Sequence, residues 1–192
     1  MSVLAWFTKC VNLIKSSKQD VALPEVFNQI QMPCITIPLQ QTYPLVMPMA
    51  QDDIYAYQIH CLLTLEGKQA IDTLINNAGF EALPEHSAPF NGLIMHSNQS
   101  SCVFLNQYAD FAGICLNLIT NDQTLLEQLI SFKSPLPDPW KSFPDIDPDT
   151  LGSLQGNLDF WCHYFWRPYW LSLSQKERLQ YPEPWREFSE FH

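Results

Sequence analysis

Apolar and polar residues alternate between positions 54 and 65, and this period of two predicts a β-strand. One face of the predicted strand carries only apolar side chains, namely Tyr55, Tyr57, Ile59, Cys61, Leu63 and Leu65. The other face is mixed, so we expect a long strand with one fully buried face. The apolar spacing then becomes helical from Ala70 to Ala78, and Gly79 stands where such a helix commonly stops.

Three further stretches predict a strand meander followed by a helix. Residues 91–97 and 101–107 flank a polar turn at 98–100, which indicates a hairpin. The near-continuous apolar run at 110–120 is typical of a central strand. Asn121 can cap the next helix. The buried stripe of that helix is expected to be Leu125, Leu126, Leu129 and Ile130.

Prolines bound the segment that precedes this meander. Residues 32–39 are rich in β-branched side chains and predict a short strand at a sheet edge, because proline cannot donate to a central ladder. Pro24 opens a possible short helix before it, and residues 40–53 after it are expected to be irregular. Together these elements predict an α+β domain, with an antiparallel or mixed sheet of about four to five strands and helices on one face.

Two segments flank the predicted sheet. Residues 3–15 place apolar side chains on a broad helical face, and we expect this amphipathic helix to dock on the domain's own core. A helix lying on a membrane surface would show a similar pattern. Residues 134–149 contain five prolines and predict a stiff, polar connector. The chain thus divides into a sheet domain at 1–133, this connector, and a helical segment at 150–192 that packs on the same domain.

The helical segment is rich in aromatic residues, with seven in the twelve positions of DFWCHYFWRPYW at 159–170. Asp147 can cap its first helix, and Pro168 should end or kink it. Ser174 with Glu177 forms a capping-box pattern for a following helix. A last helix starts at Pro184. An apolar stripe at helical spacing is expected to face the core, and it consists of Leu151, Leu154, Leu158, Trp161 and Phe165.

Tryptophan, tyrosine and arginine are also the residues that protein-binding hot spots favour. The part of the aromatic run that the stripe leaves over is therefore the candidate for an exposed docking surface. It comprises Trp166, Arg167, Tyr169 and Trp170. Core packing of the whole run and a platform for a small ligand are the alternatives.

The formal net charge of −10 is unevenly distributed along the chain. Residues 19–132 carry eleven acids and one base, Lys68. Such a surface repels phosphate backbones, so nucleic acid is not an expected partner, whereas a basic protein would be attracted. Ordinary solubility is the alternative reason for the acidity. The acidic candidates for partner binding are Asp52, Asp53, Glu81, Glu85 and Asp145.

Composition places the chain among globular domains. It has 192 residues, 46% of them hydrophobic, but no run long enough for a membrane-spanning helix. The N-terminal residues do not match a signal peptide. The six cysteines lie mostly in apolar runs and suggest buried free thiols in a reducing compartment, so we expect a cytoplasmic protein.

Patterns that would name a reaction are missing from the sequence. The acids at 145, 147 and 149 begin like a calcium loop, but Thr150 and Gly156 stand where glycine and a bidentate acid are needed. The histidines and cysteines lack the spacing of structural zinc sites, and no nucleophile elbow or phosphate loop occurs. We therefore expect neither a metal nor a cofactor, and no catalytic residues.

A small acidic α+β chain with a proline-rich connector and an aromatic helical tail ending PEPWREFSEFH resembles the bacterial immunity proteins that accompany secreted toxins, including type VI secretion effectors. The resemblance covers overall character and carries no functional residue. It implies a stoichiometric inhibitor that binds its cognate toxin tightly. The alternatives are a small cytoplasmic enzyme with a site assembled from scattered residues, or an adaptor or chaperone.

Overall fold

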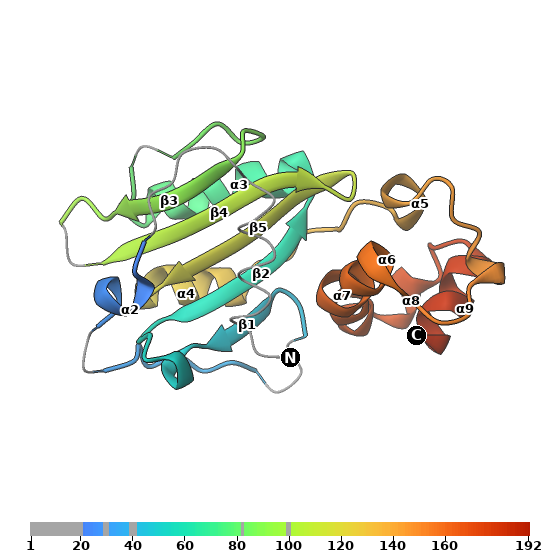
Figure 1. The fold of residues 1–192 in the computed structure, drawn as a ribbon, viewed down its shortest axis with the longest axis horizontal. Coiled ribbons are helices and arrows are strands. Elements are labelled where there is room, and N and C mark those ends of the chain that lie inside the picture. Colours follow the sequence, from blue (N-terminus) through green and yellow to red (C-terminus); the bar gives the residue numbers. More distant parts are fainter. Residues whose placement is uncertain (1–20, 29–30, 39–41, 82, 99–100) are drawn as a thin grey trace.

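A five-stranded antiparallel sheet forms the centre of the fold (Figure 1). The structure is a computed structural model that describes residues 21–192, except 29–30, 39–41, 82 and 99–100. The strand order is β1-β2-β5-β4-β3. The strands are β1 (Leu45–Pro48), β2 (Tyr57–Leu63), β3 (Phe90–Met95), β4 (Cys102–Asp110) and β5 (Gly113–Thr120). The expected α+β class is confirmed, with β5 in the middle of the sheet and β3 and β4 as the expected hairpin.

The first strand lies where the sequence predicted irregular chain. Residues 32–38 form no ladder, and the edge strand is β1, which pairs with β2 from Leu45 opposite His60 to Pro48 opposite Tyr57. An edge strand needs ladder partners on one side only, so Pro48 is tolerated there. Both segments are apolar and contain prolines, which left the sequence pattern unable to distinguish them.

Two helices cover one face of the sheet, α3 (Leu65–Asn77) and α4 (Gln123–Ile130). Thr64 caps α3 by accepting a hydrogen bond from the Gly67 N–H at 3.1 Å. The cap of α4 is Asp122 rather than the expected Asn121, because the Asp122 carboxylate accepts from the Leu125 N–H at 2.8 Å. The core of this face includes Ile59, Cys61, Leu63, Ile71, Ile75, Leu105, Leu116, Leu118, Leu125, Leu126 and Leu129.

The opposite face of the sheet is also buried, so β2 is covered on both sides. Near one end, Leu62, Phe111 and Cys115 join the aromatic core of the C-terminal helices. Toward the other end lie the one-turn helices α2 (Leu23–Val26) and η1 (Ala50–Asp52). The cluster there comprises Leu23, Phe27, Met49, Ile54, Ala56, Cys102, Phe104 and Ile119.

The proline-rich connector contributes to the core, which its polar composition did not suggest. It contains the short helix α5 (Pro139–Ser142) and the 3₁₀ turn η2 (Pro148–Thr150). Leu136 is 3% exposed and packs in the C-terminal aromatic core. Asp147 caps only the 3₁₀ turn, and the next helix begins eight residues later than expected, at Gly156.

The aromatic run forms one continuous helix that changes its pitch. It consists of α6 (Gly156–Trp161), the π-helical segment η3 (Cys162–Trp166) and α7 (Arg167–Ser172). Pro168 does not end the helix. A π turn directly before it, in which the Arg167 N–H donates to the Cys162 carbonyl, widens the helix next to the proline ring. The last helices are α8 (Gln175–Arg178), with the expected Ser174–Glu177 capping box, and α9 (Glu183–Phe191).

The amphipathic helix expected at residues 3–15 lies outside the described residues. None of the helices in the described part of the chain is long and apolar enough to cross a lipid bilayer.

Candidate partner-binding groove

Three of the four aromatic-run residues expected at a docking surface face the core instead. Trp166, Tyr169 and Trp170 are 1%, 8% and 3% exposed. Arg167 alone is exposed, and its guanidinium donates a hydrogen bond to the His192 carbonyl at 2.9 Å. Trp161 and Phe165 are fully buried, as expected. The expected docking surface on this run is therefore wrong for its three aromatic members.

The π turn explains why these rings point inward. Trp161 and Trp166 stack with ring centroids 5.2 Å apart, a contact between residues five apart that a π-helical turn allows. Trp166 in turn stacks on Trp170 at 5.7 Å. The Trp166 indole N–H donates to the Ser189 hydroxyl on α9 at 2.8 Å, which satisfies its one polar atom.

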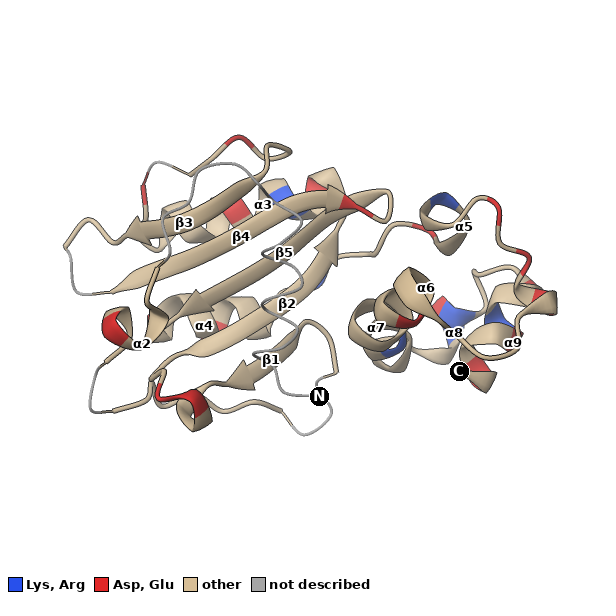
Figure 2. Cartoon of the chain, viewed as in Figure 1, with Lys and Arg blue, Asp and Glu red and all other residues tan. Residues whose placement is uncertain are grey.

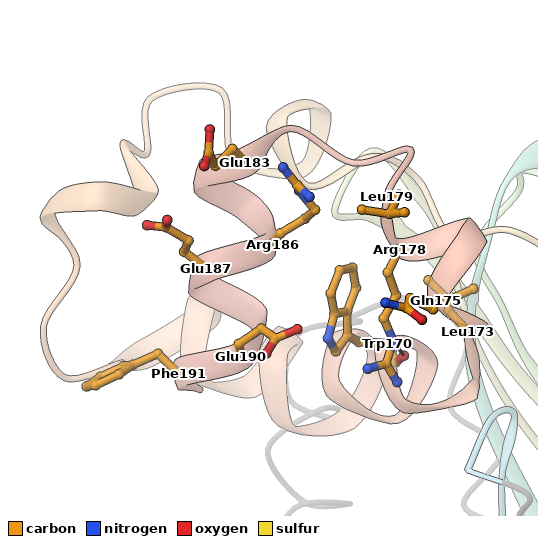
Figure 3. A pocket seen from close by; sticks show the side chains of 10 residues that line it. All are labelled: Trp170, Leu173, Gln175, Arg178, Leu179, Glu183, Arg186, Glu187, Glu190 and Phe191. Carbon is orange, nitrogen blue, oxygen red and sulfur yellow. Dashed lines mark hydrogen bonds between the residues drawn. The ribbon is translucent and has the colours of Figure 1, made fainter.

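An open groove of about 870 Å³ lies beside this aromatic stack, between α8 and α9 (Figure 3). Trp170 forms part of its lining although only 3% of the residue is exposed. Leu179 and Phe191 also line the groove, and they are 62% and 81% exposed. Leu179 lies on the Trp170 side of α9, and the Phe191 ring points away from Trp170 on the other side of that helix (Figure 3). These two are the most exposed large apolar side chains in the described part of the chain. Exposed apolar residues beside a groove are typical of an interaction site.

The groove is charged as well as apolar. Arg178 is held against its lining, because its Nε donates to the Trp170 carbonyl at 3.1 Å and its guanidinium lies 5.2 Å from the Trp170 ring centroid. The α9 side carries Glu183, Glu187 and Glu190, together with Arg186. None of these three carboxylates has a cationic partner within 4.0 Å among the described residues.

A second cavity of about 380 Å³ lies where residues before β1 meet the C-terminal helices. It is lined by tyrosines, including Tyr43, whose hydroxyl donates to the Leu62 carbonyl at 2.7 Å, and Tyr181. Burial raises the pKa of both phenols. The hydrogen bonds from Ser174 lower the pKa of the Glu177 carboxyl, which also lines the cavity. All three shifts move the pKa values further from neutral pH, whereas a group in acid–base catalysis needs a pKa near the working pH.

A cluster of charged side chains on α3 was not anticipated. The Lys68 ammonium is fully buried and lies 2.5 Å from the Asp72 carboxylate, which also contacts Nδ1 of His86. His86 is 45% exposed and belongs to a loop that Gln107 anchors by donating to the Ala88 carbonyl at 2.7 Å. The spacing of four between Lys68 and Asp72 on a predicted helix was the available signal.

The acidic candidates do not form one surface (Figure 2). Asp52 and Asp53 lie at η1 beside β1, Glu81 and Glu85 lie between α3 and β3, and Asp145 follows α5. Asp52 is half-buried and the other four are exposed. A single partner patch that contains all of them is therefore incompatible with the fold.

Four further titratable groups are held in their neutral form by burial in the core. Burial raises the pKa of the Cys61 thiol to about 12 and those of Cys102 and Cys162 to about 11. Burial also lowers the pKa of His60 to about 3. Cys34 is exposed, whereas the sequence suggested buried thiols.

Comparison of the chain with protein-family models, with curated proteins and with solved structures finds no match.

Proposed function

We propose that the chain is a non-catalytic binding protein of the immunity class, which neutralises a cognate toxin by binding it through the groove between α8 and α9. The observation that carries this proposal is the exposure of Leu179 and Phe191 in the lining of an open groove. Isolated surface leucines need no explanation, but apolar side chains gathered at a concave surface favour protein binding.

The charge of the molecule supports a basic partner. The net charge of −10 and the unpaired carboxylates on α9 would both attract a positively charged protein and speed its association. A cytoplasmic location goes with this proposal, since the buried free thiols Cys61, Cys102, Cys115 and Cys162 suit a reducing compartment.

The test is neutralisation. The protein is used to capture its partner from the native host, and the recovered protein is then co-expressed with wild-type or variant chain. We expect wild-type protein to abolish the partner's toxicity at a one-to-one ratio, and Leu179→Asp with Phe191→Asp to lose that protection. Leu65→Asp is the matched control, because Leu65 is 49% exposed but lies on α3, outside the groove. Full protection by the double groove variant would contradict the proposed site.

The alternative of a small enzyme has one specific observation in its favour, the contact between His86 and Asp72. A carboxylate that orients an imidazole is the arrangement of many general bases. His86 lines neither of the two cavities described above. If the isolated wild-type chain turned over a substrate and His86→Ala abolished turnover, the enzyme alternative would replace the binding proposal. An adaptor would bind the same partner but leave its activity intact. The neutralisation test therefore distinguishes an adaptor from an immunity protein.

A further inference from the structure

The α9 side of the groove carries a row of carboxylates with a regular spacing. Glu183, Glu187 and Glu190 are separated by four and three residues, so they lie along one side of the helix over roughly 10 Å. Trp185 and Phe188 are buried on another side of the helix and hold it against the aromatic core. The orientation of the row is therefore set by packing, and all three residues line the groove.

The row differs from an ordinary solvated helix face because apolar side chains accompany it. Leu179 lies on the Trp170 side of α9, and Phe191 extends from the far side of that helix (Figure 3). An occupant that covers both Leu179 and Phe191 passes over α9 and its carboxylates. Its apolar residues must then face Leu179 and Phe191, and its cationic residues must face the carboxylates between them.

Arg178 sharpens this requirement. Its guanidinium is held over Trp170 by the hydrogen bond to the Trp170 carbonyl, so a positive charge sits beside that ring. Arg186 adds a second positive charge on the Trp170 side of α9 (Figure 3). A lysine or arginine of the occupant that pointed there would be repelled. Basic side chains are favoured beside Glu183, Glu187 and Glu190, and apolar ones against Leu179.

We infer, on the basis of the proposed function, that the groove takes a basic amphipathic helix of the partner, with apolar residues against Leu179 and Phe191 and lysines or arginines paired with Glu183, Glu187 and Glu190. Three and four residues are the spacings at which one helix face repeats, so a partner helix can match the row. A second copy of this chain fits poorly, because its own carboxylate row and its net charge of −10 would be repelled.

Two synthetic helical peptides probe the groove of the full-length protein. Both carry the same leucine stripe, and they differ only in having lysines or glutamates along its flanks. Fluorescence anisotropy at low salt measures their binding. We expect the lysine peptide to bind at least about tenfold more tightly than the glutamate peptide, since about three exposed ion pairs are gained instead of three repulsions.

The decisive comparison is between two triple variants with the same change in net charge. Glu183→Gln, Glu187→Gln and Glu190→Gln together should weaken the lysine peptide about tenfold. Glu25→Gln, Glu81→Gln and Glu85→Gln together should change binding less than about twofold, since these three exposed residues lie outside the groove. Equal losses in both variants, tighter binding of the glutamate peptide, or no binding of either peptide would each overturn the inference.

The result is distinguishable from failure of the proposed function. If wild-type protein does not neutralise its captured partner, the proposed function fails whatever the peptides show. If neutralisation requires Leu179 and Phe191 but the Glu183, Glu187 and Glu190 variant still binds the lysine peptide like wild type, only the basic-helix inference falls. Matching thermal unfolding curves for both triple variants exclude misfolding as the cause of lost binding.

Discussion

Asp72 is the carboxylate that keeps a charged lysine inside the protein. The Lys68 side chain is fully buried, and its ammonium lies 2.5 Å from the Asp72 carboxylate. His86 contacts the same carboxylate but is 45% exposed. A buried charge that loses its partner destabilises the folded protein, because water cannot hydrate it. An exposed side chain that loses its partner is hydrated instead, at little cost in free energy. The three residues should therefore contribute unequally to stability.

We predict that Asp72→Asn lowers the free energy of unfolding by about 3–5 kcal/mol, because it leaves the Lys68 ammonium buried without a counter-charge. His86→Ala should cost about 1 kcal/mol or less, since Asp72 keeps its pair with Lys68. Urea unfolding of both variants measures the two costs. A loss for His86→Ala as large as for Asp72→Asn would mean that the cluster chiefly anchors the loop.

His60 makes the stability of the protein depend on pH. It is buried against Phe165, with ring centroids 4.7 Å apart, and burial lowers its pKa to about 3. The unfolded chain binds a proton near pH 6.5, whereas the folded chain does not. Above about pH 6.5, His60 is neutral in both the folded and the unfolded protein and does not affect stability. As the pH falls from 6.5 toward 3, only the unfolded chain gains the proton, so the free energy of unfolding decreases.

Between pH 6.5 and 4.5, we predict that wild-type protein loses about 2 kcal/mol more stability than His60→Gln, which has no imidazole to protonate. The other histidines are common to both proteins and cancel in the comparison. Urea unfolding at several pH values gives the two slopes. If the free energy of unfolding fell equally with pH in both proteins, His60 would bind a proton as readily in the folded protein as in the unfolded chain.

At the scale of elements, the β4–β5 hairpin turns on two residues that are not glycine. Phe111 and Ala112 have φ angles of 52° and 55°, in the left-handed region that favours glycine. Phe111 is compensated by its burial in the C-terminal aromatic core. Ala112 is exposed and has no such compensation.

Ala112→Gly should accordingly stabilise the protein by about 0.5–1 kcal/mol, because the relief of strain exceeds the entropy that glycine adds to the unfolded chain. The matched control is Ala109→Gly, which makes the same exchange at an exposed position within β4 and should destabilise by a similar amount. Thermal unfolding of the two variants gives the signs. If both glycine variants were less stable than wild type, Ala112 would not be a source of backbone strain in the hairpin.

The sequence pattern predicted most elements but not their ends or the inward turn of the aromatic run. Alternation located β2, because its wholly apolar face packs against the core under α3 and α4. The polar stretch at 98–100 between two apolar stretches located the β3–β4 hairpin. A 3.6-residue period left Trp166 and Trp170 outside the core stripe, and the π turn at Cys162–Trp166 changes that period. The groove was missed for a different reason. Leu179 follows α8 and Phe191 ends α9, and only tertiary packing brings them to one groove.

At the scale of the whole molecule, the sheet and the C-terminal helices share one core. Leu62, Phe111 and Cys115 of the sheet region pack in the same cluster as Trp161 and Phe165. That shared packing suggests that the two regions unfold together. Tryptophan fluorescence reports mainly on the C-terminal region, since five of the six tryptophans lie between positions 140 and 185, whereas far-ultraviolet circular dichroism reports on the whole backbone.

Phe165→Ala tests this coupling. The ring is fully buried and lies against His60 of the sheet, so its loss should cost about 3–5 kcal/mol. If the molecule is one cooperative unit, the fluorescence and circular dichroism transitions shift together and stay coincident. Phe191→Ala removes the same ring from a position that is 81% exposed and should change stability by less than about 0.5 kcal/mol. A variant in which fluorescence changes at lower urea than circular dichroism would instead make the C-terminal helices a separate unit, because Phe165 would then stabilise them without stabilising the sheet.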